Sequence, residues 1–417
     1  MTVPSPPSAD RGAAPIGRGE RITNLDTVRG VATLGILVMN AVSYGLPEAA
    51  YFNLDAAGSG SWLDWTVGVL GEILVDQKTM ALFSLLFGAG IVVFADRAEA
   101  KGRRPVWLSL WRNLLLFGFG VLHTLLWDGD ILTVYAICAP VLLLLRKRSP
   151  RTLLISGTAL VVLSAVWATL TQLLVDITPD ELGSIWFVDG GTSGDAVGLF
   201  FIADFFLRAL GMMLVGVALY RLEIVQGTRP AAYYRRMAVC GLGVGLPLAA
   251  LGVAIQFAGE WGVDTALVGA APNTLATIPI ALGYLAVITL WNQAGDARAA
   301  TGWQIPVHER LRAVGRMALT NYLTQTIIGI VVLRGVLDAG PDGSRELGRA
   351  AIFGFVLIVW AVQVLWSKPW LDRFRFGPFE WLWRVLTYRR MQPLVRAREV
   401  ARGTSGEPPR GAPRQTS

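Results

Sequence analysis

The chain has 417 residues, of which 53% are hydrophobic and 16% charged, and its mean hydropathy is +0.50. This composition excludes an ordinary soluble domain and a disordered chain, and it indicates an all-α, polytopic integral membrane helical bundle. With two cysteines, Cys138 and Cys240, and two histidines, His123 and His308, neither a disulfide framework nor a histidine-rich metal site is expected. The net charge of +7 follows the topology described below, so we expect the lipid bilayer, and no nucleic acid, as a partner.

Ten apolar runs follow a short N-terminal tail. The tail, residues 1–20, is rich in Pro, Gly, Ser and Ala, and we expect it to be disordered and cytoplasmic, without a cleaved signal peptide. Most runs approach the ~20 residues that a membrane-crossing helix requires. The count is ten if residues 62–95 form one long or broken span. The runs lie near residues 30–46, 62–95, 106–127, 130–146, 152–175, 197–220, 237–257, 270–291, 317–337 and 350–367.

The basic residues test this count through the positive-inside rule. With the N-terminus in the cytoplasm, all but five of the 37 Lys and Arg residues fall in inner segments. A wrong number of spans would invert part of the series, so we predict about ten transmembrane helices with both termini in the cytoplasm. The five exceptions are Lys78, Arg208, Arg334, Arg345 and Arg349.

The spans divide into two predicted halves of five helices each. The N-terminal half covers residues 21–175, and the C-terminal half covers residues 197–390. The second half ends in an amphipathic segment, residues 376–388, which we expect to lie in the inner interface of the membrane as a helix. The tail that follows, residues 391–417, is basic and is expected to be disordered.

One hairpin of the first half carries ionisable groups at its tip. Two apolar helices are joined by the turn Trp127-Asp128-Gly129-Asp130, and His123 lies one turn before that corner. Ionisable groups are costly in lipid, so His123, Asp128 and Asp130 are candidates for a site. An imidazole beside a carboxylate can act as a general base, although a lone histidine in a helix also serves packing or hydrogen bonding. Both interpretations stay open at this stage.

The second run holds a further set of charges. Glu72 and Asp76 are four residues apart and share a helix face, with Lys78 close by. Two such carboxylates can work as acid and base, bind a cation, or bond to neighbouring helices. Asp204 and Arg208 are also four apart, which favours a structural ion pair within one helix.

Five strings resemble a known family. They are LDTVRGVATLGILVMN, LFSLLFGAG, HTLLWDGDILTVYAI, GRMALTNYLTQT and GPFEWLWRVLTY. In this order, over residues 21–390, they resemble the YeiB-like family of uncharacterised bacterial inner-membrane proteins, known as domain of unknown function 418. The N-terminal half is distantly similar to transmembrane acyltransferases such as heparan-glucosaminide acetyltransferase. That resemblance implies a plasma-membrane location and a polar transfer path lined by Asp26, Arg29, Glu72, Asp76, His123 and Asp130.

One departure limits this resemblance. In the acetyltransferase branch a histidine precedes, on the same segment, the aspartate that Asp76 resembles, whereas residues 61–75 of this chain contain none. If acyl transfer occurs, His123 would have to supply the base from another helix, with Asp130 or Asp128 orienting it.

The leading hypothesis is acyl transfer from cytoplasmic acyl-CoA, a co-substrate and not a permanent cofactor, to a hydroxyl or amine at the outer face. The acceptor would be a small molecule or an envelope glycan or lipid. Arginine is suited to phosphate binding, so the expected acyl-CoA site comprises Arg29, Arg104, Arg112, Arg316 and Asn321.

Two alternatives stay open beside acyl transfer. One is a small-molecule transporter with a midplane site formed by Glu72, Asp76, Lys78, Asp204 and Arg208. It would be driven by an ion gradient, because no GxxxxGK[ST] motif occurs. The other is a membrane partner without turnover.

Overall fold

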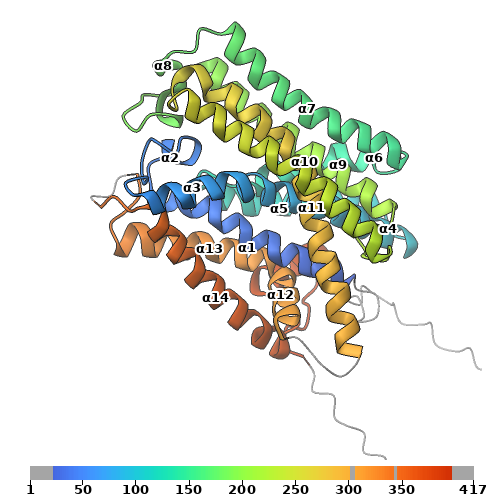
Figure 1. The fold of residues 1–417 in the computed structure, drawn as a ribbon. Helices are drawn as coiled ribbons and strands as arrows, with labels where there is room; N and C mark the ends of the chain where they lie inside the picture. The colour runs from blue at the N-terminus through green and yellow to red at the C-terminus, as the bar shows by residue number, and fades with distance from the viewer. Residues whose placement is uncertain (1–21, 301–305, 342–344, 397–417) are drawn as a thin grey trace, which may run out of the picture.

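The fold is a helical bundle, seen in a computed structural model that describes residues 22–300, 306–341 and 345–396 (Figure 1). Within these residues nine helical segments are long and apolar enough to cross a membrane, and a tenth apolar helix is shorter. Apart from an isolated bridge between Phe374 and Val395, the described residues form no β structure. The predicted all-α polytopic membrane fold is therefore confirmed. The predicted tail 1–20, and residues 397–417 of the second tail, lie outside the described residues, and the division into two halves stays a prediction.

The ten predicted runs correspond to ten helical segments. The membrane-length helices are α1 (Thr23–Gly45), the pair α3 (Trp62–Leu74) and α4 (Lys78–Ala100), α5 (Pro105–Thr124), α7 (Pro150–Leu174), α9 (Asp195–Arg221), α10 (Ala231–Ala258), α11 (Ala266–Ala300), α13 (Ala318–Gly329) continued by a π-helix (Ile330–Val336), and α14 (Arg349–Arg373). The shorter helices are α2 (Ala49–Phe52), α6 (Leu132–Leu145), α8 (Pro179–Leu182), α12 (Pro306–Arg316) and α15 (Pro378–Tyr388).

The run at 62–95 forms a broken span. A straight helix over the 39 residues Trp62–Ala100 would be about 58 Å long, far more than the ~30 Å of a hydrocarbon core. The chain breaks after α3, where Gln77 adopts a left-handed conformation with φ +59°. At its other end α3 begins with a capping box, in which Ser61 and Asp64 each accept a hydrogen bond from the other's backbone N–H.

Close helix packing positions the elements around α1. Helix α1 contacts α4, α11, α12, α13 and α14, and α10 and α11 run side by side (Figure 1). In lipid, helices associate through van der Waals packing, which small residues permit. Gly315 on α12 illustrates this, because a Cβ there would lie 1.9 Å from the carbonyl oxygen of Asp26 on α1. This crossing brings the first turns of α1 to the end of α12.

The predicted amphipathic segment forms α15, with Pro378 in its first turn, where a missing N–H leaves no hydrogen bond unmade. Leu382 and Leu386 are exposed on one side of this helix. The opposite side, with Glu380 and Arg384, lines a cavity inside the bundle. The polar face of α15 thus contributes to an internal site.

Candidate active site

The hairpin of α5 and α6 holds His123 against Asp130. The Nδ1 atom of His123 lies 2.8 Å from Oδ1 of Asp130, and both side chains are almost fully buried. The backbone N–H of Thr133 donates to Oδ2 of the same carboxylate at 2.9 Å. Asp130 therefore ties the start of α6 to the imidazole at the end of α5. Only seven residues separate the two partners, so the short turn brings them together.

A glycine makes this approach possible. Gly120 lies on α5, one turn before His123, and a Cβ at this position would be 2.7 Å from Oδ2 of Asp130 and 2.8 Å from the backbone nitrogen of Thr133. Those distances are too short for any side chain, so the carboxylate fits against α5 because residue 120 has none.

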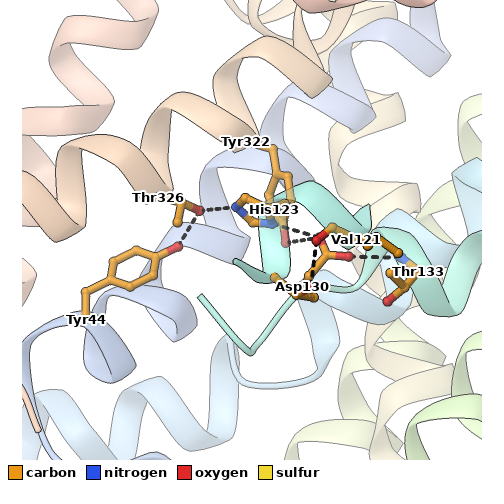
Figure 2. Close-up of polar contacts among 8 residues, drawn as sticks. Tyr44, Val121, His123, Asp130, Thr133, Tyr322 and Thr326 are labelled. Carbon is orange, nitrogen blue, oxygen red and sulfur yellow. Dashed lines mark hydrogen bonds and ion pairs between the residues drawn. The ribbon is translucent and has the colours of Figure 1, made fainter. Parts of the chain in front are cut away.

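Two further helices complete the site from the other side of the imidazole. Thr326 on α13 places its hydroxyl 2.9 Å from Nε2 of His123, and Tyr44 on α1 places its own hydroxyl 2.9 Å from that of Thr326. Figure 2 shows Thr326 between these two side chains. Tyr322, one turn earlier on α13, donates to Oδ1 of Asp130 at 3.4 Å and packs against the imidazole, with ring centroids 5.2 Å apart.

With an ionised Asp130 and a neutral imidazole, the hydrogen bonds allow one consistent assignment of the protons. Asp130 accepts from the N–H of Thr133, and an ionised carboxylate can only accept, so we assign the N–H of the imidazole to Nδ1. In the neutral imidazole Nε2 is then the acceptor, so we assign Thr326 as the donor to Nε2 and Tyr44 as the donor to Thr326. A hydroxyl, an imidazole and a carboxylate in this order form the arrangement in which histidine takes a proton from a hydroxyl.

A cavity of about 310 Å³ leads toward this site. Along α1 its lining runs from Ile22, just before the helix, to Ile36, a distance of about 21 Å at 1.5 Å per residue. The lining carries an excess of positive charge, with six arginines and only two acidic residues, and the end near Ile22 holds Arg97 from the last turn of α4 and Arg316 from the last turn of α12. The arginines are Arg29, Arg97, Arg112, Arg316, Arg375 and Arg384, and the acidic residues are Asp26 and Glu380.

The far end of the cavity stops just short of the polar site. On three helices, a residue of the polar site lies one to two turns beyond the last residue that lines the cavity, on the same face of the helix. The pairs are Ile36 and Tyr44 on α1, Leu116 and His123 on α5, and Tyr322 and Thr326 on α13. Tyr322 belongs to both sets, because it lines the cavity and bonds Asp130.

Aromatic and acidic side chains surround the arginines that line the cavity. The guanidinium of Arg112 lies 3.9 Å from the ring centroid of Trp383 and 4.5 Å from that of Phe94. Glu380 accepts from both the N–H and the hydroxyl of Thr320, at 3.0 and 2.5 Å. Burial nevertheless raises the pKa of Glu380 above its ordinary value, because the charged carboxylate is poorly solvated there.

Three of the five residues predicted to hold acyl-CoA line this cavity, namely Arg29, Arg112 and Arg316. Arg104 is exposed before the first turn of α5 and is outside the lining. Asn321 is buried, donates to the carbonyl oxygen of Val314 and to the hydroxyl of Ser367, and also lies outside the lining.

Several lining and site residues were not predicted from the sequence. Arg375 and Arg384 follow the last span, where positive-inside topology already accounts for an arginine. Tyr44 and Thr326 are uncharged, so they do not stand out among the ionisable residues of the membrane-spanning runs. The polar string NYLTQT within an apolar run was the one available signal for Thr326.

The other predicted carboxylates lie apart from His123. Asp128 is exposed in the turn of the hairpin. Glu72 and Asp76 line a second cavity of about 50 Å³ together with Tyr51 and Arg349. Burial and the nearby Asp76 raise the pKa of Tyr51 well above its ordinary value.

Three charged residues near the second cavity, Lys78, Asp204 and Arg208, are engaged with structural partners. Lys78 donates to the backbone carbonyl of Glu72 and to the side-chain oxygen of Asn273. Asp204 and Arg208 form the predicted ion pair within α9. The structure thus brings His123 and Asp130 together at one place and keeps Glu72 and Asp76 at another.

Comparisons with known proteins place the chain among uncharacterised relatives. Residues 219–390 match the model of the family described as "Protein of unknown function (DUF418)". The chain is 33% identical over 400 residues to the uncharacterized protein YeiB of Escherichia coli K12, covering 90% of this chain and 98% of the relative. It is 30% identical over 414 residues to the uncharacterized protein YxaH of Bacillus subtilis 168, covering 91% and 98%. An uncharacterized 39.9 kDa protein of Bacillus acidopullulyticus is 26% identical over 393 residues, covering 93% and 99%.

Proposed function

The chain belongs to the YeiB-like family of proteins of unknown function (DUF418), and we propose that it is a membrane-bound acyltransferase using cytoplasmic acyl-CoA. One observation carries the proposal. A cavity with an arginine-rich end runs along α1 and stops at Tyr322, which bonds the carboxylate that orients His123. An anionic donor bound at the arginines would thus point its reactive end at an acid–base pair.

The lining of the cavity suits an acyl-CoA in two ways. Arginine binds phosphate through parallel N–H donors, and the excess of arginine over acidic residues favours an anionic group. Beyond the arginines, the lining turns apolar, which suits an uncharged pantetheine arm and an acyl chain. The apolar lining includes Phe83, Leu86, Phe87, Leu116 and Leu132.

The chemistry follows from the His123 and Asp130 pair. Nε2 of His123 takes the proton of an attacking hydroxyl or amine, the new bond forms to the thioester carbonyl carbon, and the carbon–sulfur bond breaks. The imidazolium then gives its proton to the departing CoA thiolate. Asp130 stabilises the imidazolium and holds its tautomer. The acceptor would be a small molecule or an envelope glycan or lipid at the outer face of the bacterial plasma membrane.

Release of CoA thiol tests the proposal. The full-length protein, purified in detergent, would receive acetyl-CoA or octanoyl-CoA together with a glycan and lipid extract of a bacterial envelope. We expect thiol release by the wild type, and a loss of about 1,000-fold or more in His123→Ala at unchanged elution volume. Absence of release by the wild type with every acyl-CoA would overturn the proposal, and full activity of His123→Ala would remove the proposed base.

Gradient-driven transport is a second candidate, favoured by the break between α3 and α4. Discontinuous membrane helices form ion and substrate sites in transporters, and Glu72 and Asp76 line a cavity beside this break. Under acyl transfer, Glu72→Gln should leave thiol release unchanged within about twofold, because this residue lies outside the His123 site. Uptake by proteoliposomes that collapses in Glu72→Gln would favour transport instead.

A further inference from the structure

The acceptor position of the proposed base is already occupied. The hydroxyl of Thr326 lies 2.9 Å from Nε2 of His123, the only ring nitrogen left free to accept a proton once Nδ1 donates to Asp130. A hydroxyl of an external acceptor would have to displace it. The group that the structure presents to the base therefore comes from the protein itself.

The hydroxyl of Thr326 makes different bonds from those of three other threonines in the helices. Thr33, Thr289 and Thr324 donate to a backbone carbonyl four residues earlier, which is the ordinary bond for a threonine in a helix. The hydroxyl of Thr326 instead lies between Nε2 of His123 and the hydroxyl of Tyr44. The hydroxyl of Thr326 is therefore oriented toward the imidazole, and the hydrogen bond with Tyr44 holds it in that orientation.

The position of Thr326 suits a group that receives an acyl chain. It lies four residues, or about 6 Å along the helix, beyond Tyr322 at the end of the cavity. Its side chain is fully buried, so an ester formed there would be shielded from water. The helix changes from α to π at Ile330, one turn later, and such departures often accompany functional sites.

We propose that Thr326 is the nucleophile of the reaction and carries the acyl group between donor and acceptor. This inference rests on the proposed function. In the first step Oγ1 of Thr326 attacks the thioester carbonyl as His123 takes its proton, the carbon–sulfur bond breaks, and the imidazolium protonates the CoA thiolate. In the second step the acceptor hydroxyl or amine attacks the threonyl ester, His123 takes its proton, and that proton returns to Oγ1. Both half-reactions balance without any other reagent.

A single-turnover labelling experiment tests the inference. The purified full-length protein would receive acetyl-CoA labelled in the acetyl group, without acceptor, and the digested protein would be analysed by mass spectrometry. We expect about one CoA thiol released per chain and the acetyl group on the peptide that contains Thr326. Thr326→Val should lose both signals, at least 100-fold below wild type, whereas Thr326→Ser should keep the label at the same position.

A matched control separates this effect from damage to α13. Thr324→Val removes a hydroxyl that bonds only backbone carbonyls of the same helix, so it should behave as wild type. Acyl transfer that survives in Thr326→Val, or a label found on His123, would overturn the inference while the proposed function stands. If the wild type releases no thiol with or without the envelope extract, the proposed function fails and the inference fails with it.

Discussion

Two groups of ionisable residues in the described membrane-spanning segments, one around His123 and one around Glu72 and Asp76, are built differently. Around His123 the hydrogen bonds form one directed series from Tyr44 through Thr326 to Asp130, at the end of a cavity of about 310 Å³. Around Glu72 and Asp76 the cavity is about 50 Å³. The neighbouring Lys78 is bound there to a backbone carbonyl and to an amide.

Ionisable side chains are costly to bury in a membrane, and this protein contains them in two different roles. Charges that bond fixed backbone and amide partners hold a broken helix together, as Lys78 does between α3 and Asn273 on α11. A series that runs through an imidazole to a carboxylate, and that adjoins space for a ligand, can move a proton. An intramembrane charge is therefore informative about function only together with the direction of its hydrogen bonds and the space beside it.

The largest expected effect comes from Asp130, with Asp128 of the same turn as its control. Asp130→Asn places an amide where Nδ1 of His123 donates, favours the wrong tautomer, and should lower acyl transfer by as much as about 10⁴-fold. Asp128→Asn, two residues away and exposed, should leave the rate unchanged. Thiol release measured on both variants checks this, and equal losses would mean that the turn acts as a whole and not through Asp130.

A second, smaller effect should follow from crowding Asp130 without changing its charge. Gly120→Ala puts a methyl group 2.7 Å from Oδ2, so the carboxylate must shift, and we expect transfer to fall by about 10- to 100-fold. Gly118→Ala, on the same helix with nothing within 4 Å of the added Cβ, is the control. An unchanged rate in Gly120→Ala would contradict the close fit described for the hairpin.

The smallest effect concerns Glu380, which lines the cavity. Because burial raises the pKa of Glu380, its contribution to folding stability is complete at acid pH, below its unfolded pKa. That contribution is lost as pH rises through the folded pKa. The unfolding temperature of the wild type should therefore fall by about 1–3 °C relative to that of Glu380→Gln as pH rises. The prediction concerns this change with pH and not the difference between the two proteins at any one pH. Thermal unfolding in detergent from pH 4 to 8 checks the sign, with Glu309→Gln as an exposed control; parallel curves would contradict the burial of this carboxylate.

Hydropathy and charge were sufficient to predict the fold. Long apolar runs specify helices locally, so all ten runs became helices, whereas the predicted positions of the termini in the cytoplasm stay a prediction. The pairing of His123 with Asp130 was also predictable, because a tight turn joins them. The break after α3 was anticipated only as a possibility, since the run of 62–95 reads as one apolar segment.

The rest of the site depends on contacts between distant segments. Thr326 is 203 residues from His123, and Tyr44 is 282 residues from Thr326, so neither partnership is visible in local patterns. The same holds for the arginines. Arg104 and Arg112 look equally suitable in the sequence. In the structure Arg104 precedes α5 and is exposed, whereas Arg112, eight residues later, lines the cavity. Packing of α13 and α15 against α5 decides which residues form the site.

Binding of acyl-CoA to the full-length protein, followed by calorimetry in detergent, tests the central claim most directly. It compares the wild type with Arg112→Ala, which loses a cavity arginine stacked on Trp383, and Arg104→Ala, which loses an exposed one. We predict saturable binding that weakens by about tenfold or more in Arg112→Ala and stays unchanged in Arg104→Ala. Absence of binding by the wild type, or equal affinity in Arg112→Ala, would contradict the assignment of this cavity to an acyl-CoA donor.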